Sequence, residues 1–208
     1  MALRKRSCRV SANDFQERNA KMIYIIRHGQ TALNITNALQ GRSDHPLNET
    51  GIRQAEEAAE RLKGVSFDIV YSSPLIRAIR TAEIIAPKRK PIIDERLIEM
   101  EYGPYEGKSL RELGPEVMTF FRDFVHNPAP EGMEPLDSVV KRGGAFMEDC
   151  CRTDGNILIS THAIAMKGIL EYLTPDSGGS YWSRNIRNCA VFTAEYLPEG
   201  AWSVPVEL

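Results

Sequence analysis

The sequence predicts an α/β fold, a three-layer α/β/α sandwich built around a mainly parallel sheet. From Met22 onward, short runs rich in isoleucine and valine alternate with stretches of helical periodicity, which is the pattern of repeated βα units. The chain has 208 residues, of which 42% are hydrophobic and 26% are charged. This length allows one α/β domain with a substantial core, and this composition is typical of an ordinary soluble globular protein.

Four strands and four helices carry the fold prediction. The apolar, β-branched runs predict strands at residues 22–27, 67–72, 157–161 and 189–196. Helical patterns predict helices at residues 51–63, 74–86, 137–151 and 163–173. Thr50 is the expected N-cap of the first helix, and Ser73 with Pro74 is expected to start the second.

The predicted domain begins at Met22. Residues 1–21 are polar and mixed in charge, which predicts a disordered N-terminal extension. The basic start of this segment would also suit a targeting peptide, although Asp14 and Glu17 argue against one, and Met22 could itself be the initiator. Residues 22–208 are expected to form a single domain. A lid insert at about 108–133 is separated from the main scaffold by the Pro/Gly-rich stretch 127–135.

Charge and hydropathy limit the possible partners. The net charge is -2 and the isoelectric point is near 6.1, so no global positive field attracts nucleic acid or an anionic membrane. No apolar run approaches the roughly 18 residues of a membrane span, and the first 21 residues lack the apolar core of a signal peptide. We therefore expect a cytoplasmic protein without nucleic-acid or membrane partners, acting as a monomer or as a weak homodimer.

Charged side chains follow three of the predicted strands. The first strand leads into Arg27, His28 and Gly29, the strand at 157–161 leads into His162, and Arg77 lies in the first helical turn after the second strand. Ligands of open α/β sheets bind beyond the carboxyl ends of the strands, so these groups would converge if the strands are neighbours. Helix N-termini at the same edge also favour anions. The pattern therefore predicts a phosphate site.

The chemistry of these residues favours phosphoryl transfer to His28. Guanidinium forks match phosphate oxygens, so Arg27 and Arg77 would hold a phosphate dianion. A neutral imidazole could then attack phosphorus, provided that its other nitrogen is held, and the tight turn at Gly29 offers a backbone carbonyl for this. One alternative is that His162 is merely structural. Another is a zinc site, but the arginines would repel a cation and no third ligand has suitable spacing, so no metal or other cofactor is expected.

Longer motifs extend along the chain beyond these residues. In order they are RHGQT followed by Asn34, QGRSDHPLNETGIRQAE, SSPLIRAIRTAE, ERLIEMEYGPYEGKSLREL, EGMEPLDSVVKR and ISTHAIAMKGIL. This series resembles the histidine phosphatase superfamily, also called phosphoglycerate mutase-like, from Met22 almost to Leu208. Several ordered motifs are far more specific than an R-H-G triplet alone. The resemblance implies a phosphoglycerate mutase-like fold.

The resemblance also implies the catalytic roles. His28 would be the nucleophile, and both arginines and His162 would complete the phosphate pocket. Glu99 would be the general acid that protonates the leaving oxygen and then the base that activates water. Glu101 is a rival for this position, and Glu99 could instead belong to a structural ion pair.

A larger group of residues is expected to bind the substrate. These residues are Arg27, His28, Gly29, Gln30, Thr31, Asn34, Gln40, Gly41, Arg77, Glu99, Tyr102, His162 and Ala163. The segment from Thr31 to Gly41 could also be an ordinary polar loop. The chain departs from the family pattern at Ala163, where the family usually has glycine, and at Met133. Alanine keeps its backbone N–H but restricts φ after His162.

The lid must distinguish a phosphatase from a mutase, because the two share their fold and motifs. Its charged residues, three basic and four acidic, are Lys108, Arg111, Arg122, Glu112, Glu116, Asp123 and Glu131. Mutases of the family carry a longer insert with basic residues that retain a bisphosphate, so this short insert resembles the phosphatase branch.

We therefore expect a phosphomonoester hydrolase that acts on a small phosphorylated metabolite through a phosphohistidine at His28. The alternatives are cofactor-dependent phosphotransfer of the phosphoglycerate mutase type and a catalytically silent regulator that binds a phosphorylated ligand. Phe120, Phe121 and Phe124 have helical spacing in the lid. They could contact the organic part of a substrate or simply pack the lid against the domain.

Overall fold

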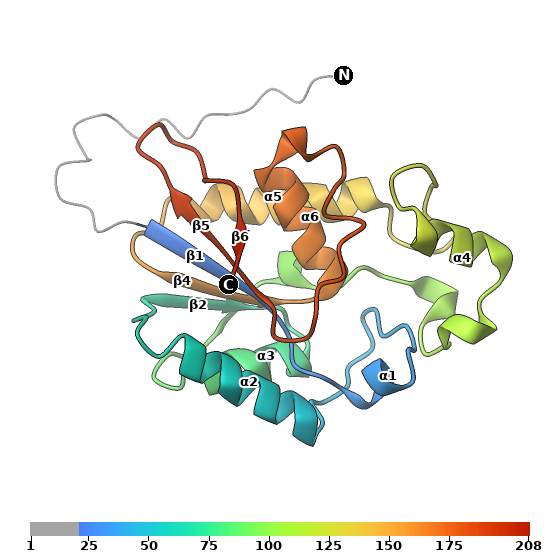
Figure 1. Cartoon of the computed structure of the whole chain (residues 1–208), viewed down its shortest axis with the longest axis horizontal. Helices are drawn as coiled ribbons and strands as arrows, with labels where there is room; N and C mark the ends of the chain where they lie inside the picture. Colours follow the sequence, from blue (N-terminus) through green and yellow to red (C-terminus); the bar gives the residue numbers. More distant parts are fainter. Residues whose placement is uncertain (1–20) are drawn as a thin grey trace.

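The computed structural model describes residues 21–208, and within this range six strands form one mixed sheet (Figure 1). Their order across the sheet is β3-β2-β4-β1-β5-β6. The strands are β1 (Lys21–Arg27), β2 (Ile69–Ser72), β3 (Ile92–Ile93), β4 (Ile157–Thr161), β5 (Val191–Tyr196) and β6 (Val206–Glu207). The pairs β3–β2, β2–β4 and β4–β1 are parallel, and β5 runs antiparallel to both of its neighbours. The prediction of a mainly parallel sheet is confirmed.

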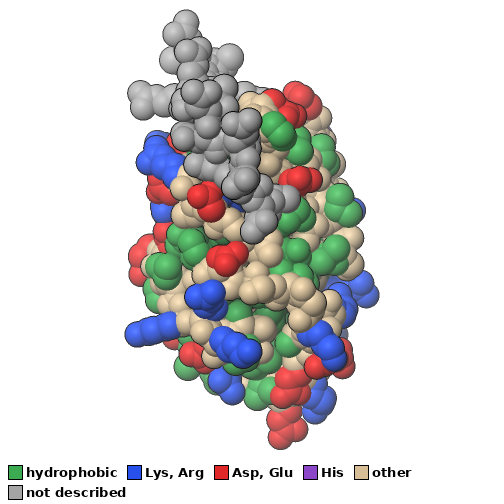
Figure 2. Space-filling view, turned by 90° about the vertical axis from the view of Figure 1, so that its left-hand side faces the viewer, with side chains coloured by type: hydrophobic (Ala, Val, Ile, Leu, Met, Phe, Trp, Pro, Cys, Tyr) green, Lys and Arg blue, Asp and Glu red, His purple; other side chains and the backbone are tan. Residues whose placement is uncertain are grey.

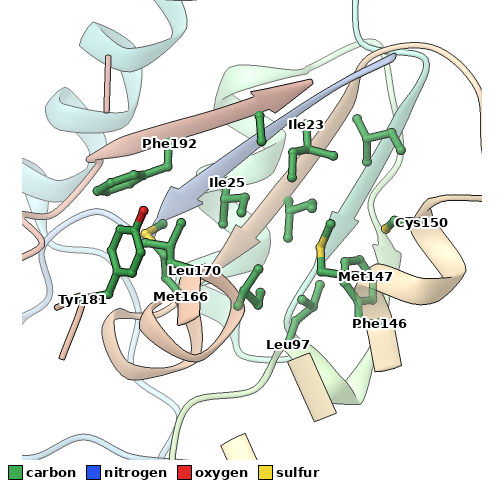
Figure 3. Close-up of a cluster of buried hydrophobic side chains, with 14 of the residues drawn as sticks. Ile23, Ile25, Leu97, Phe146, Met147, Cys150, Met166, Leu170, Tyr181 and Phe192 are labelled. Atoms are coloured by element: carbon green, nitrogen blue, oxygen red, sulfur yellow. The ribbon is translucent and has the colours of Figure 1, made fainter. Parts of the chain in front are cut away.

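Helices cover both faces of the sheet and complete the predicted three-layer sandwich. They are α1 (Ala32–Ile35), α2 (Glu49–Arg61), α3 (Ile76–Ile85), α4 (Pro115–Arg122), α5 (Leu136–Cys150) and α6 (Ala163–Leu173). On one face, Ile25 packs in a cluster with Phe146 of α5 and Met166 of α6 (Figure 3). On the other face, Ile26 packs in a cluster with residues of α2 and α3. These adjacent isoleucines enter opposite cores because successive side chains of a strand alternate between faces.

The lid insert lies at one end of the molecule, away from the central layers (Figure 1). It contains a 3₁₀ turn at Leu110–Glu112 and the helix α4. Its apolar side chains join a separate cluster with Met100 and Trp182. Phe124 lies beyond the end of α4 at Arg122, but its ring still contacts that of Phe120 at a centroid distance of 4.8 Å. Phe124 therefore packs on Phe120, as helical spacing predicts, although it lies outside the helix.

Several predicted boundaries change for local reasons. The N-cap of α2 is Asn48 rather than Thr50, because the Asn48 side chain accepts a hydrogen bond from the Gly51 N–H. The strand predicted at 189–196 begins only at Val191, since Cys189 has a φ of 54°, which is outside the strand region. Residues 1–20 of the predicted N-terminal extension lie outside the described part of the chain, and β1 begins at Lys21.

The surface of the described chain combines both signs of charge. On the face seen in Figure 2, acidic and basic side chains are interspersed with hydrophobic ones and form no continuous basic surface. None of the helices within residues 21–208 is long and apolar enough to cross a membrane.

Close contact between α5 and α6 depends on glycines. A Cβ atom at Gly168 of α6 would lie 2.8 Å from Cγ1 of Val139 and 3.3 Å from its backbone carbonyl. Real Cβ atoms do not approach so closely, and Val139 is fully buried, so it has no free space to move into. The missing side chain at Gly168 lets α5 and α6 pack at the distance that aligns both against the sheet.

We expect Gly168→Val to lower the free energy of unfolding by about 1–3 kcal/mol through overpacking. Gly64→Val is the matched control, because no atom lies within 4 Å of a Cβ placed there. Urea unfolding followed by circular dichroism would give both values. Equal losses in the two variants would contradict the role assigned to the α5–α6 contact.

Candidate active site

The carboxyl ends of β1 and β4 bring two histidines together. Arg27 pairs with Thr161 in the parallel register of these strands, so His28 and His162 are the next residue of each. Their ring centroids are 5.1 Å apart, and both residues are buried. Arg77 is supplied by α3, which follows β2, the other neighbour of β4. The strands β2, β4 and β1 are therefore adjacent in the sheet. This is the condition for the predicted convergence of these side chains.

One hydrogen bond determines the chemical state of His28. Its Nδ1 lies 2.7 Å from the backbone carbonyl oxygen of Gly29, and a carbonyl can only accept, so Nδ1 carries the hydrogen. Burial, followed by the positive charges of Arg27 and Arg77, holds the pKa of His28 well below its usual value. The imidazole is therefore neutral near pH 7, and its Nε2 carries the lone pair needed by a nucleophile.

His162 is a second neutral imidazole beside the first. Its Nε2 lies 2.7 Å from the hydroxyl of Ser73, at the end of β2. Burial and then the charge of Arg77 hold the pKa of His162 well below its usual value. Its Nδ1 is buried and has no hydrogen-bond partner among residues 21–208. One ring nitrogen of His162 thus remains available for a bound group.

The two guanidinium groups are anchored by backbone carbonyls rather than by carboxylates. Arg27 donates from Nη1 to the carbonyl of Ile186 at 2.5 Å, and Arg77 donates to the carbonyls of Ser43 and Gly41, both at 2.7 Å. In each arginine the Nε–H is buried and has no partner within the described chain. A buried donor without a partner is costly, so these N–H groups suit an anion bound between them.

Glu99 has its carboxylate at the start of α6, the helix that follows His162. Its carboxylate accepts hydrogen bonds from the backbone N–H groups of Met100, Ile164 and Ala165 at 2.8, 3.3 and 3.0 Å. Only 6% of the residue is exposed. Its negative charge also acts on Arg27, where it counteracts the lowering of the guanidinium pKa by burial. Glu99 therefore belongs to the same electrostatic site as the two arginines.

The rival Glu101 occupies a different environment. Half of its side chain is exposed, and its carboxylate forms a salt bridge of 2.9 Å with Arg42. A carboxylate engaged in this way at the surface does not face the two histidines. The geometry thus favours Glu99 over Glu101 as the acidic group of the site.

The loop after β1 forms a network around the histidine turn. The Thr31 hydroxyl donates to the side-chain oxygen of Gln40 at 2.9 Å, and the Thr31 N–H donates to that of Asn34 at 3.0 Å. Asn188, in the loop before β5, donates to the carbonyl of His28 at 2.9 Å. Gln30 instead faces α2, where its side-chain oxygen accepts from Asn48. Thr31, Asn34 and Gln40 therefore bond to one another beside the histidine turn, whereas Gln30 contacts the start of α2.

The two remaining predicted residues have simple local settings. Ala163 is the first residue of α6, so it adopts helical geometry that alanine favours, and glycine is not required there. Tyr102 is buried against Phe121, with ring centroids 5.9 Å apart. Burial and the nearby Glu99 raise the pKa of the Tyr102 hydroxyl well above its usual value.

A buried lysine lies where the lid meets α6. Lys167 donates to the carbonyl of Trp182 at 2.8 Å, and its ammonium lies 5.2 Å from the ring centroid of Phe124. Burial lowers the pKa of Lys167 to about 8. This contact joins the end of the lid to the loop that precedes β5.

A polar cavity of about 770 Å³ borders the site. Arg27 and Asn34 line it from the side of the histidine turn, and Arg61, Arg187 and Asn188 line it elsewhere. The two histidines are not among its lining residues. The cavity therefore shares Arg27 with the histidine site but does not include the histidines themselves. Within the described chain, no three His, Cys, Asp or Glu side chains are grouped so that they could hold a metal ion.

A model of the histidine phosphatase superfamily (branch 1) matches residues 23–206. The chain belongs to this superfamily. Some similar proteins are named as mutases and others as phosphatases. The "Probable phosphoglycerate mutase GpmB" of Yersinia pestis is 30% identical over 188 residues, which cover 86% of either chain.

Solved structures of the superfamily share the whole fold. A phosphoserine phosphatase variant from Entamoeba histolytica, crystallised with phosphoserine, is 29% identical with a TM-score of 0.77, and the match covers 90% of this chain and 94% of that one. YhfR from Bacillus stearothermophilus is 31% identical with a TM-score of 0.79, covering 89% and 95%.

Sequence reasoning did not identify several residues that shape the site. Ser73 contacts His162, Asn188 contacts the backbone of His28, and Thr81 accepts a hydrogen bond from the Gly29 N–H. Ser73 could have been found, because it ends a predicted strand at the same sheet edge. Asn188 and Thr81 carry no such signal, since their contacts depend on tertiary packing.

The neutral histidines predict acid sensitivity of the fold. Their pKa values are lowered in the folded state, so below about pH 6.5 the unfolded chain binds protons that the folded chain excludes. The free energy of unfolding should therefore decrease as the pH is lowered below about 6.5, by up to about 1.4 kcal/mol per pH unit for each histidine. Urea unfolding at pH 7.5 and 5.5 measures this loss, and His28→Gln should reduce it. An identical loss in that variant would refute the assignment.

Proposed function

We propose that this chain is a phosphomonoester hydrolase that works through a phosphohistidine at His28. The observation that carries the proposal is the fixed, neutral state of His28 beside two guanidinium groups. The Gly29 carbonyl holds Nδ1–H, so Nε2 can act as the nucleophile. The Nε–H groups of Arg27 and Arg77 are available for the phosphoryl oxygens.

In the first step, Nε2 of His28 attacks phosphorus and the bond between phosphorus and the ester oxygen breaks. The two guanidinium groups stabilise the charge on the phosphoryl oxygens without needing to reorganise, because backbone carbonyls already hold them. His162 adds a further polar group at the same phosphoryl oxygens through its unpartnered Nδ1.

In the first step Glu99 acts in its protonated form, gives its proton to the leaving oxygen and becomes the carboxylate. An alkoxide is a poor leaving group, so proton donation accelerates its departure. In the second step, the Glu99 carboxylate takes a proton from water as the water oxygen attacks phosphorus. The phosphorus–nitrogen bond breaks, inorganic phosphate leaves, and His28 returns to its neutral state.

The lid supports hydrolysis rather than phosphate retention. Its basic residues Lys108, Arg111 and Arg122 are all exposed, while its buried residues are apolar. A mutase must hold a bisphosphate as it reorients, which calls for inward-facing cations. The inner face of this lid instead packs aromatic rings against one another. Water is therefore the proposed acceptor of the phosphoryl group.

The substrate that fits best is a small, polar phosphomonoester. The lining of the cavity beside Arg27 includes arginine and asparagine side chains together with Glu57 and Glu207, and these groups offer hydrogen bonds to a hydroxylated or charged organic group. The lid phenylalanines are largely used in their own packing. Phosphoserine in the structure of the Entamoeba relative is a compound of this kind.

His28→Ala should abolish release of inorganic phosphate from every monoester that the chain hydrolyses. A screen would include phosphoserine, sugar phosphates, phosphoglycerates and nucleotides, with phosphate measured directly. Wild-type protein quenched during turnover should also contain acid-labile, base-stable phosphate. Normal turnover by His28→Ala would eliminate the proposed mechanism.

Glu99→Gln should slow hydrolysis about 10²- to 10⁴-fold for esters of alcohols with a high pKa. The loss should be much smaller in the first step with p-nitrophenyl phosphate, whose leaving group needs no proton. Glu101→Gln is the matched control, because its carboxylate pairs with Arg42 at the surface. Pre-steady-state release of p-nitrophenol would separate the steps, and an equal loss for both leaving groups would contradict the acid role.

The mutase alternative is supported by the name of the Yersinia relative. It makes a different prediction, namely that 2- and 3-phosphoglycerate interconvert in the presence of a bisphosphate primer without net phosphate release. Measuring both products in one reaction decides between the two activities.

A further inference from the structure

Glu106 connects the segment that carries Glu99 to the turn at residues 40–43. Its Oε1 accepts the backbone N–H of Arg42 at 2.9 Å, and its Oε2 accepts that of Ser43 at 3.1 Å. The Tyr102 N–H donates to Oε1 as well, at 3.4 Å. One carboxylate therefore holds backbone from two parts of the chain that are about 60 residues apart.

The turn is shaped to receive this carboxylate. Gly41 has a φ of 53°, and a Cβ atom there would lie 2.1 Å from Oε1 of Glu106. The carboxylate thus occupies the space that a side chain at position 41 would need. Backbone pairing supports the approach, since the Gly107 N–H donates to the carbonyl of Leu39 at 2.7 Å and the Leu39 N–H donates to that of Lys108 at 3.0 Å.

The same turn orients Arg77. The carbonyls of Ser43 and Gly41 accept the two Nη groups of Arg77, and this arginine is fully buried. Within residues 21–208, Glu106 forms no hydrogen bond or salt bridge with the guanidinium itself. The Glu106 carboxylate accepts backbone N–H groups of the turn, and backbone carbonyls of the same turn accept the hydrogen bonds from Arg77.

We propose that Glu106 is a positioning residue that sets the direction of the Arg77 Nε–H toward the phosphoryl group. The proposal rests on the proposed function, in which Arg77 binds that group. Without the carboxylate, the Arg42 N–H loses its acceptor and the Ser43 N–H keeps only the Gln40 carbonyl. The turn then relaxes, and the carbonyls that aim Arg77 shift with it. Glu106 belongs to the same segment as Glu99, so its contact with the turn also sets the separation between Arg77, which binds the phosphoryl group, and Glu99, which protonates the leaving oxygen.

Glu106→Gln tests the proposal with little change in size. A glutamine side chain has an NH₂ donor in place of one carboxylate oxygen, so it cannot repeat both contacts of the carboxylate with the N–H groups of the turn. We expect kcat/KM for p-nitrophenyl phosphate to fall about 10- to 100-fold, as small misplacements of binding groups do. Inhibition by orthovanadate should weaken about 10-fold, because Arg77 no longer meets its oxygens correctly.

The matched control is Glu112→Gln. Glu112 lies in the same part of the chain, accepts the Ser109 N–H at 2.7 Å, and is exposed. Both variants remove one negative charge, but only Glu106→Gln should change the orthovanadate inhibition constant. A merely structural role for Glu106 would lower the unfolding midpoint and leave that constant unchanged in the folded fraction, which would overturn the proposal.

Gly41→Ala tests the same contact from the other side. Its Cβ would displace the Glu106 carboxylate, so it should weaken orthovanadate inhibition as Glu106→Gln does. The two changes combined should cost little more than the larger single effect, because they disrupt one contact. Additive losses would contradict the inference.

His28→Ala distinguishes this inference from the proposed function. Loss of activity in His28→Ala together with normal kinetics and normal orthovanadate inhibition in Glu106→Gln would reject only the role of Glu106. Normal activity in His28→Ala would reject the proposed function and, with it, the purpose assigned to Arg77.

Discussion

The parallel pairing of β1 with β4 is the constraint on which the site depends. Because Arg27 lies opposite Thr161, the next residue of each strand is a histidine, and both leave the sheet at the same edge. A slip of one residue would send one imidazole to the opposite face. Large apolar side chains on both faces of β1 make such a slip costly. The register that buries the core is thus the register that pairs the histidines.

Burial at this edge gives the groups their chemical state. The two imidazoles are neutral because they lie away from water and close to two permanent cations. The cations in turn are held by carbonyl dipoles rather than neutralised by carboxylates. In the proposed mechanism their charge therefore remains available to the phosphoryl group. Glu99, held by backbone N–H groups at the start of α6, adds the acidic group without forming an ion pair within 4 Å of either arginine in the described chain.

Sequence reasoning succeeded where periodicity is strong and the strand end is clear. The predicted strand at 157–161 coincides with β4, and the predicted helix at 163–173 coincides with α6. The strands β3 and β6 have two residues each, too few to show a period. His28, His162 and Arg77 could be found because strand ends share one sheet edge. The contacts of Glu106 could not, because they involve a turn more than 60 residues earlier in the chain.

The fate of the phosphoryl group depends on which groups face it from the lid. Retention of a second anion requires cations on the inner face, whereas the lid cations here point outward and its inner face is aromatic. The buried cation nearest to this lid within the described residues is Lys167, whose ammonium is engaged by the Trp182 carbonyl and the Phe124 ring. A bisphosphate would have to displace those contacts to use it. A water molecule needs no such cation, and this difference supports the proposed hydrolysis.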